Sequence, residues 1–548
     1  MRALVLTLSA LVAPAQQEAP AADPHAACAA TGWVPREILE RPVALRTGIG
    51  NARERVTTAS KEAQAFYDQG LDYLHGYVWI EAARSFHQAL RIDPGIAMAH
   101  VGLSRVFSGL DDPEAARKAV ARARELAADA SPRERRRVAL RELQLEAMAE
   151  LGDTQKHLRY KKALDEALAA EIEAPELWLL RGNAEEPTAA GRGQRGGVAS
   201  AAFYLQALQA APDNAAAHHY LTHSYETIGQ IPRALVHGEA YARLAPAIPH
   251  AHHMWGHDLR RVGRIDDAIV AFLETDALEK AYYAAENVPA GLDWHHGHNL
   301  DLLATAYQHK GRMKQAEEAM REAAALPAVT EYLEFNQKQM PVFLLSRGRF
   351  EEALGAARRL AEGSWAASRA VGHVLAGHAL LALGRSAAAE SELAAAEREL
   401  LGVAPVVAGL SVSRSAVQPY VDALRGEILL RSGRTAEGRR LLEEVQGTLR
   451  AALGPDAWIQ ALFRLESIAR VAQSVGDWEL AEHTAGQMLE HDPSYGGSHL
   501  ALAAVAAHKG DRALAERELL AAESCWRDAD PDLPELALVR ARKADPGR

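Results

Sequence analysis

Recurring glycines constrain the fold of this 548-residue chain more than any other feature of its sequence. Gly229 and Gly263 are 34 residues apart, and each follows a stretch whose apolar residues have helical spacing. A glycine just past a helix suits the left-handed conformation that closes it. A repeat of this length predicts stacked helix–turn–helix units. The series continues through Gly311, Gly348, Gly384, Gly433, Gly476 and Gly510.

Composition agrees with a helical repeat protein. Ala, Leu, Glu and Arg dominate, and aromatic residues make up only 6% of the chain. We therefore expect an all-α fold, an α-solenoid of about eleven or twelve helix–turn–helix units. A net charge of −11 argues against general nucleic-acid binding. No later stretch is apolar for the ~18 residues that a bilayer requires, so we predict no transmembrane segment.

The segment from Ala65 to Pro94 shows the repeat most clearly, with small residues at Gly70 and Ala82 and an aromatic ring at Phe86. Small residues let two helices approach closely, and proline ends the second helix. This pattern resembles the tetratricopeptide repeat (TPR), a 34-residue helix–turn–helix unit. The resemblance implies a superhelix whose concave surface binds a peptide or protein partner.

The N-terminus predicts export. Arg2, the apolar run Ala3–Val12 and the small residues around Pro14 are typical of a cleaved signal peptide, which indicates a periplasmic or extracellular location. The chain then divides by composition and repeat pattern. We predict a signal peptide at 1–15, a disordered or linker segment at 16–55, N-terminal TPR units at 56–212 with a Gly-rich insertion at 182–200, histidine-rich central units at 213–326, and C-terminal units with a capping helix at 327–548.

The Gly-rich insertion contains a formal G-x-G-x-x-G at Gly191, Gly193 and Gly196. A dinucleotide site needs a strand before this loop, and here a helix precedes it. We therefore interpret the insertion as a loop over the concave face that acts as a lid beside the histidines.

Histidines are concentrated in the central units. Eleven of the 23 in the chain lie between His218 and His298. His219 and His223 lie ten and six residues before Gly229, and His253 and His257 lie ten and six residues before Gly263. Residues four apart share a helix face, so the two pairs face the same concavity.

Carboxylates extend this set. Glu226 continues the face of the first pair, Asp301 takes the repeat position of His219, and His298 lies one turn before Asp301. Imidazole with carboxylate suits zinc, copper, iron or manganese. The predicted metal ligands are His219, His223, Glu226, His253, His257, His298 and Asp301.

Residues 33–312 also resemble exported bacterial TPR proteins that have a histidine-rich central region. The matching motifs are H-x-x-x-H-x-x-E from His219, H-x-x-H-M-x-x-H from His250, and H-N-x-x-x-L from His298. The resemblance implies a TPR fold and export, and it implies no particular reaction.

Two functional hypotheses follow. In the first, the protein is an exported scaffold whose histidine-rich groove binds a peptide or protein partner, or a metal ion. In the second, it is a metal-dependent oxidoreductase or hydrolase, with Glu226 as a candidate general base. The sequence contains no common catalytic motif, so it leaves the enzymatic hypothesis open. A third possibility is that the histidines only stabilise the fold.

Overall fold

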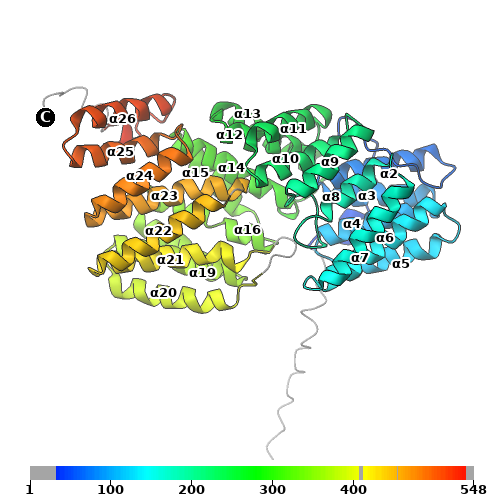
Figure 1. Cartoon of the computed structure of the whole chain (residues 1–548), viewed down its shortest axis with the longest axis horizontal. Helices are drawn as coiled ribbons and strands as arrows, with labels where there is room; N and C mark the ends of the chain where they lie inside the picture. The colour runs from blue at the N-terminus through cyan, green and yellow to red at the C-terminus, as the bar shows by residue number, and fades with distance from the viewer. Residues whose placement is uncertain (1–32, 406–410, 453, 538–548) are drawn as a thin grey trace, which may run out of the picture.

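The computed structural model describes residues 33–405, 411–452 and 454–537 (Figure 1). Within these ranges every regular element is a helix, and the helices form twelve successive helix–turn–helix pairs. The predicted all-α solenoid is confirmed. Two short helices, α1 (Arg36–Leu39) and α16 (Glu331–Asn336), stand outside the pairs.

The first six pairs build the N-terminal and central parts. They are α2 (Lys61–His75) with α3 (Trp79–Ile92), α4 (Ala97–Gly109) with α5 (Pro113–Leu126), α6 (Pro132–Ala149) with α7 (Thr154–Ala170), α8 (Pro175–Asn183) with α9 (Val198–Ala210), α10 (Ala215–Thr227) with α11 (Ile231–Leu244), and α12 (Pro249–Arg261) with α13 (Ile265–Glu286).

The last six pairs follow a single 3₁₀ turn, η2 (Ala290–Leu292). They are α14 (Trp294–His309) with α15 (Met313–Ala325), α17 (Gln339–Ser346) with α18 (Phe350–Ala361), α19 (Ala366–Ala382) with α20 (Ser386–Leu401), α21 (Arg414–Arg431) with α22 (Thr435–Ala451), α23 (Pro455–Val475) with α24 (Trp478–His491), and α25 (Gly496–His508) with α26 (Arg512–Cys525).

The glycine series ends the first helix of each of the last eight pairs, as predicted. Each of these glycines has a positive φ, for example 72° at Gly229 and 75° at Gly384. Side chains other than glycine rarely adopt this conformation. The repeat period in the sequence is therefore a record of where the backbone must turn.

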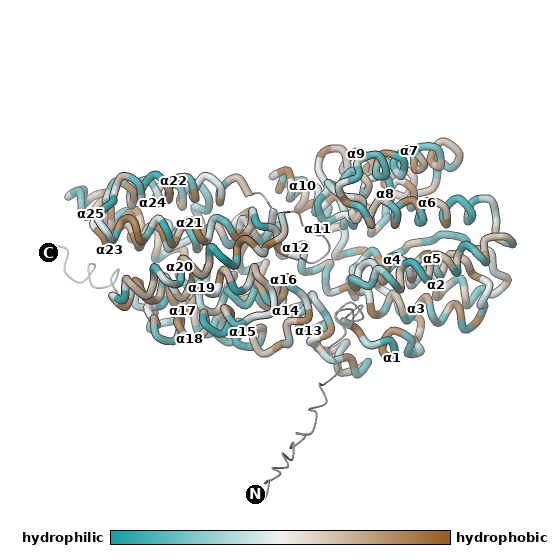
Figure 2. The backbone as a smooth tube through the Cα atoms, turned by 90° about the horizontal axis from the view of Figure 1, so that it is seen from below, coloured by the Kyte–Doolittle hydropathy of each residue, from teal (hydrophilic) through white to brown (hydrophobic). Residues whose placement is uncertain are grey.

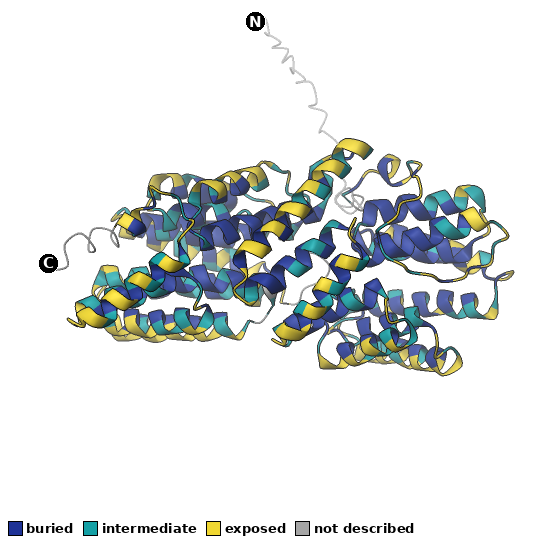
Figure 3. Cartoon of the chain, turned by 90° about the horizontal axis from the view of Figure 1, so that it is seen from above, coloured by how far each residue is buried: buried dark blue, intermediate teal, exposed yellow. Residues whose placement is uncertain are grey.

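First helices are much more buried than second helices. All of α14 is buried from Trp294 to His309, whereas its partner α15 buries only Ala316, Ala319 and Met320. Figure 3 shows buried residues gathering between the helix layers and exposed residues on the outer rims. Hydropathy alternates along most helices in Figure 2, as expected of helices with one covered face.

The superhelix folds back on its central repeats from both sides, so its inner face is filled. On the N-terminal side, the rings of Trp79 and Trp294 stack with centroids 5.6 Å apart. On the C-terminal side, the indole of Trp526 donates a hydrogen bond to the carbonyl of His309 at 2.9 Å. Figure 1 shows the central helices (green) between the N-terminal (blue to cyan) and C-terminal (yellow to red) repeats.

The segment predicted as a disordered linker is folded from Trp33 onward. Val34, Ile38 and Val43 are buried, and the indole of Trp33 donates to the carbonyl of Leu292 at 3.1 Å. The prediction was wrong here because this stretch has no repeat pattern of its own but is held by contacts that include residues more than 200 positions away. Residues 16–32 lie outside the described residues, as do the predicted signal peptide and residues 538–548 of the predicted cap.

Among the described residues, none of the helices combines the length and the apolar character needed to cross a bilayer.

Candidate metal centre

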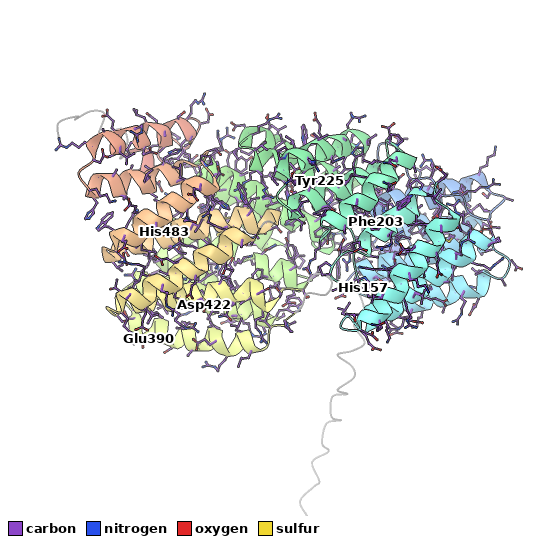
Figure 4. All side chains as sticks on the ribbon, in the orientation of Figure 1. His157, Phe203, Tyr225, Glu390, Asp422 and His483 are labelled. Atoms are coloured by element: carbon purple, nitrogen blue, oxygen red, sulfur yellow. The ribbon has the colours of Figure 1, made fainter. Side chains whose placement is uncertain are left out.

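Three consecutive first helices place seven histidines in one buried group, which we call the histidine cluster. Helices α10, α12 and α14 supply them, and none of the seven is more than 7% exposed. Burial is not common to all histidines of the chain: His483 on α24, labelled in Figure 4, is exposed. The members are His219, His223, His250, His253, His257, His295 and His298.

Three rings of the cluster point their Nε2 atoms towards one another, and we call these rings the upper triad. The Nε2 atom of His219 lies 3.1 Å from Nε2 of His223 and 3.0 Å from Nε2 of His250. The Nε2 atoms of His223 and His250 are 3.4 Å apart. Two nitrogens bound to a tetrahedral zinc ion at 2.0–2.1 Å are about 3.3 Å apart. The spacing of the triad therefore fits a single metal ion.

Hydrogen bonds behind the rings fix which nitrogen carries the proton. Nδ1 of His219 donates to the carbonyl of His75 at 2.7 Å, and a carbonyl can only accept. Nδ1 of His295 donates to the Glu279 carboxylate at 2.5 Å. When the ring of His295 is neutral, its Nε2 accepts from Nδ1 of His250 at 2.9 Å. The Nε2 atoms of His219 and His250 are thus both left with lone pairs.

Two lone pairs facing each other at 3.0 Å repel unless a cation lies between them. His223 can supply one N–H to this space, which satisfies one lone pair at a time. A metal ion would satisfy all three nitrogens at once. This arrangement is what distinguishes the upper triad from histidines that are paired for structure alone.

The rings of the upper triad are neutral at pH 7. Burial, with the charge that His257 would carry, lowers the pKa of His223 to about 3. Burial also lowers the pKa values of His219 and His250 well below 6.5. Metal binding requires deprotonated ligands. These nitrogens could therefore bind a metal without first losing a proton.

Aromatic rings enclose the upper triad. Tyr77 packs on His219 and His250, with centroids 4.6 and 5.1 Å away, and Tyr241 stacks on His219 at 4.7 Å. Tyr77 has a φ of 59°, a left-handed conformation that a non-glycine residue rarely adopts. Such a conformation costs about 1 kcal/mol, so the surrounding contacts must hold the ring in place.

The Gly-rich insertion holds Tyr77 from behind. The Tyr77 hydroxyl donates to the carbonyl of Arg192 at 2.7 Å, and the guanidinium of Arg192 lies over the Trp79 ring. The carboxylate of Glu186 accepts the backbone N–H groups of Arg192 and Gly193. The insertion therefore lies beside the histidines, as the sequence suggested, and it is anchored there by hydrogen bonds. A cavity of about 50 Å³ between this loop and Tyr77 reaches the aromatic wall of the triad.

Two predicted ligands lie apart from the converging nitrogens. The carboxylate of Glu226 lies 3.9 Å from Nδ1 of His223 and 3.5 Å from Nδ1 of His257, behind both rings. It also faces Asp258, whose pKa is raised well above its ordinary value by burial and by Glu226. Asp301 joins none of the three-histidine sets; it is buried beside Lys338 and Asp456.

Two cluster members were missing from the predicted ligand set, His250 and His295. Each lies three residues before a predicted ligand, His253 or His298, and so on the same helix face. This spacing was available as a signal. What it could not show is that His250 turns its Nε2 towards α10 and its Nδ1 towards α14.

No family model and no curated protein matches the sequence. Solved structures of helical repeat proteins do match. The crystal structure of YrrB, a TPR protein with an unusual peptide-binding site, is 17% identical, covering 36% of this chain and 91% of that chain at a TM-score of 0.26. The APC/C hetero-tetramer Cut9–Hcn1 is 12% identical, covering 87% and 83% at 0.36.

The human IFIT1 dimer with PPP-AAAA is 14% identical and covers 78% of this chain and 90% of that chain at a TM-score of 0.39. The fold assignment stands on the twelve helix pairs of this chain and on its glycine period. The protein is a TPR-like α-solenoid.

Proposed function

We propose that this chain is an exported metalloprotein whose histidine cluster holds a transition-metal ion at His219, His223 and His250. The observation that carries the proposal is the convergence of three neutral Nε2 atoms within 3.0–3.4 Å, two of them with protons fixed on the opposite nitrogen. Three imidazole ligands suit zinc, copper or iron. Three protein ligands also leave a fourth position, as in catalytic sites.

The chemistry that this site supports best is redox chemistry. A hydrolytic substrate must touch the metal, and the three ligand rings are only 0–7% exposed. The 50 Å³ cavity beside Tyr77 admits only a small molecule. Electrons, in contrast, can reach a buried metal without contact between the metal and the donor. We therefore propose a metal-dependent oxidoreductase acting on a small molecule or through electron transfer.

Elemental analysis tests the proposal directly. Protein purified from its native compartment, without a histidine tag or chelator, should contain at least one equivalent of copper, iron or zinc per chain. The change His219→Ala with His223→Ala should remove one equivalent. His378→Ala is the matched control, because His378 lies six residues before Gly384 as His223 lies six before Gly229.

A redox titration of the metal-loaded protein then separates the two chemistries. A reversible one-electron change, followed by electron paramagnetic resonance, would support redox function. A loaded protein that holds only redox-silent zinc would overturn it. A chain that stays metal-free after incubation with zinc, copper and iron would refute the metal site altogether.

A second candidate function, partner binding, is favoured by a separate cavity in the C-terminal repeats. This cavity has a volume of about 290 Å³ and is lined mainly by apolar side chains, among them Leu375, Phe463 and Val471. His378 lies in its wall. The histidine cluster is buried, so a peptide or protein partner would bind here and not against the cluster.

The substitution Ser467→Trp tests this candidate. Ser467 is an exposed residue of the cavity wall, so a large ring there would fill the cavity at a stability cost of about 0.5 kcal/mol or less. A partner recovered by pull-down with the wild-type protein should be lost with this variant. Retention of the partner would place its binding surface elsewhere.

A further inference from the structure

The histidine cluster contains a second set of three rings, His253, His257 and His298, which we call the lower triad. One nitrogen from each ring lies within 4.8 Å of the other two. The residues are 0%, 2% and 7% exposed. They come from α12 and α14, whereas the upper triad comes from α10 and α12. No atom of the lower triad belongs to the upper one.

Proton positions in the lower triad follow from its hydrogen bonds. The amide of Asn299 donates to the carbonyl of Phe272 at 3.0 Å, so its Oδ1 accepts from Nδ1 of His253 at 3.0 Å. The hydroxyl of Tyr332 donates to Asp456 at 2.6 Å, so its oxygen accepts from Nδ1 of His298 at 3.0 Å. Both rings therefore present an unprotonated Nε2.

Several buried polar atoms of these residues make no hydrogen bond in the described part of the chain. Nε2 of His253, both nitrogens of His257 and Oδ1 of Asp456 are buried and make no hydrogen bond. Leaving a buried polar atom without a partner costs about 1–3 kcal/mol. Nδ1 of His257 faces Glu226 at 3.5 Å, behind the ring, whereas the other three atoms belong to residues around the lower triad, which indicates that a ligand completes the site.

Asp456 supplies an oxygen to this place from a distant part of the chain. It lies in the first turn of α23, and its Oδ1 is 3.8 Å from Nε2 of His298. Its Oδ2 accepts a hydrogen bond from Tyr332, whereas its Oδ1 makes none, so Oδ1 is the atom that can bind a cation.

The rings between the two triads cannot form a third site at the same time. His250, His253 and His295 also approach one another. However, Nδ1 of His250 and Nε2 of His295 are already bonded to each other, and Nδ1 of His253 is bonded to Asn299. The free nitrogens thus separate into two groups, one at each end of the cluster.

We propose that the lower triad binds a second metal ion through three imidazole nitrogens, and that Oδ1 of Asp456, which lies beside Nε2 of His298 but outside the 4.8 Å set, is its oxygen ligand. Adding a hard oxygen ligand makes this position more suitable for iron, manganese or zinc than the all-nitrogen upper triad. The inference rests on the proposed function in one respect only, since it places both ions in one histidine cluster. His295 links the two positions: it accepts from His250, and its ring centroid lies 4.5 Å from that of His253.

Equilibrium dialysis of the full-length, metal-free protein against zinc chloride, followed by elemental analysis, tests the second site. We expect two equivalents of zinc in the wild type. Asp456→Asn should keep its shape and its contact with Tyr332 but weaken the second equivalent at least 10-fold. His257→Ala should remove the second equivalent and leave the first. His219→Ala should remove the first and leave the second.

The outcomes separate this inference from the proposed function. One equivalent in the wild type, lost in His219→Ala and unchanged in Asp456→Asn, would overturn the second site and leave the first intact. One equivalent that responds only to His257→Ala and Asp456→Asn would support the lower site and overturn the upper one. No zinc in any variant would refute both. Far-UV circular dichroism confirms that each variant is folded, and His378→Ala provides the control.

Discussion

Two regions of this solenoid share one architecture and differ in what fills the inner face. In the central repeats, α10, α12 and α14 turn histidines towards one another. In the C-terminal repeats, the inner helices surround an apolar cavity of about 290 Å³. His378 takes the repeat position of His223 but donates from Nδ1 to the Glu427 carboxylate at 2.6 Å. A histidine on the inner face is therefore not a metal ligand by position alone.

What separates the regions is the balance of donors and acceptors. His378 is paired with the Glu427 carboxylate, which accepts the hydrogen bond from its Nδ1. The cluster has seven rings. Among the described residues, Glu279 is the carboxylate that lies within 3.0 Å of one of them, at Nδ1 of His295. Nitrogens are therefore left facing nitrogens. A buried space that contains more lone pairs than N–H groups is stabilised by binding a cation, and this is the feature that separates the cluster from His378.

The largest expected effect is that of acidification, which should lower folding stability through the buried histidines of the cluster. In the metal-free protein, His223 and His298 have pKa values of about 3 and 4, lowered by burial, whereas an unfolded histidine titrates near 6.5. Below pH 6.5 the unfolded chain binds more protons, so folding stability falls with pH by about 1.4 kcal/mol per pH unit for each ring. Urea unfolding between pH 7 and 5 measures this loss.

The control for acidification is His223→Leu, which removes one such ring and should show a shallower loss of stability. A slope equal to that of the wild type would contradict the prediction.

The C-terminal half contains a histidine whose pKa is shifted in the opposite direction, His499. A hydrogen bond with Cys525, together with Glu518, raises the pKa of His499 to about 9. Its contribution is present at pH 6 and is lost as the pH rises through 9.

Replacing one histidine-bound carboxylate in each region by glutamine should affect metal affinity in the central region alone. Glu279 accepts from Nδ1 of His295 at 2.5 Å and from Nδ1 of His296 at 2.9 Å. Glu279→Gln can satisfy only one of these, so His295 and then His250 lose their fixed orientation. We expect metal affinity to fall about 10–100-fold. Titration with zinc against a competing chelator measures it.

Glu427→Gln is the matched change in the C-terminal region, because Glu427 holds His378 in the same manner. We expect it to leave metal affinity unchanged. If both variants lost affinity equally, the effect would be one of general stability and not of ligand orientation.

The smallest expected effect is one that should be the same in both regions. Gly263 and Gly384 have φ values of 79° and 75°. A Cβ atom at Gly263 would meet Ser494 at 3.7 Å, and at Gly384 it would meet nothing within 4 Å. Alanine at either position should therefore cost only the backbone term, about 1 kcal/mol. Chemical denaturation of Gly263→Ala and Gly384→Ala measures both, and markedly unequal losses would show that the repeats are not equivalent scaffolds.

The sequence predicted the scaffold well because the scaffold is local. The glycine period marks helix ends directly, and the pairs His219/His223 and His253/His257 follow from spacing along one helix. His298 was found in the same way. Each of these predictions needs information from one repeat or from two neighbouring repeats.

The rest of the site depends on contacts that the repeat pattern does not contain. Asp456 reaches His298 from α23, more than 150 residues away, and the His75 carbonyl reaches His219 from α2. Glu226 was expected among the ligands because it shares a helix face with His223. It lies behind the rings instead, facing Nδ1 of His223 and of His257.

The closure of the superhelix on its central repeats changes how the chain should come apart. An open solenoid behaves as a one-dimensional array, in which terminal repeats unravel independently. Here His309 pairs with Asp492 at 2.9 Å, and the backbone N–H of Asp530 donates to the carbonyl of Gly311. The last repeats are therefore a wall of the central ones. Deleting the last repeats would therefore expose buried surface of the central repeats, and we expect unfolding to begin there and not at the new C-terminus.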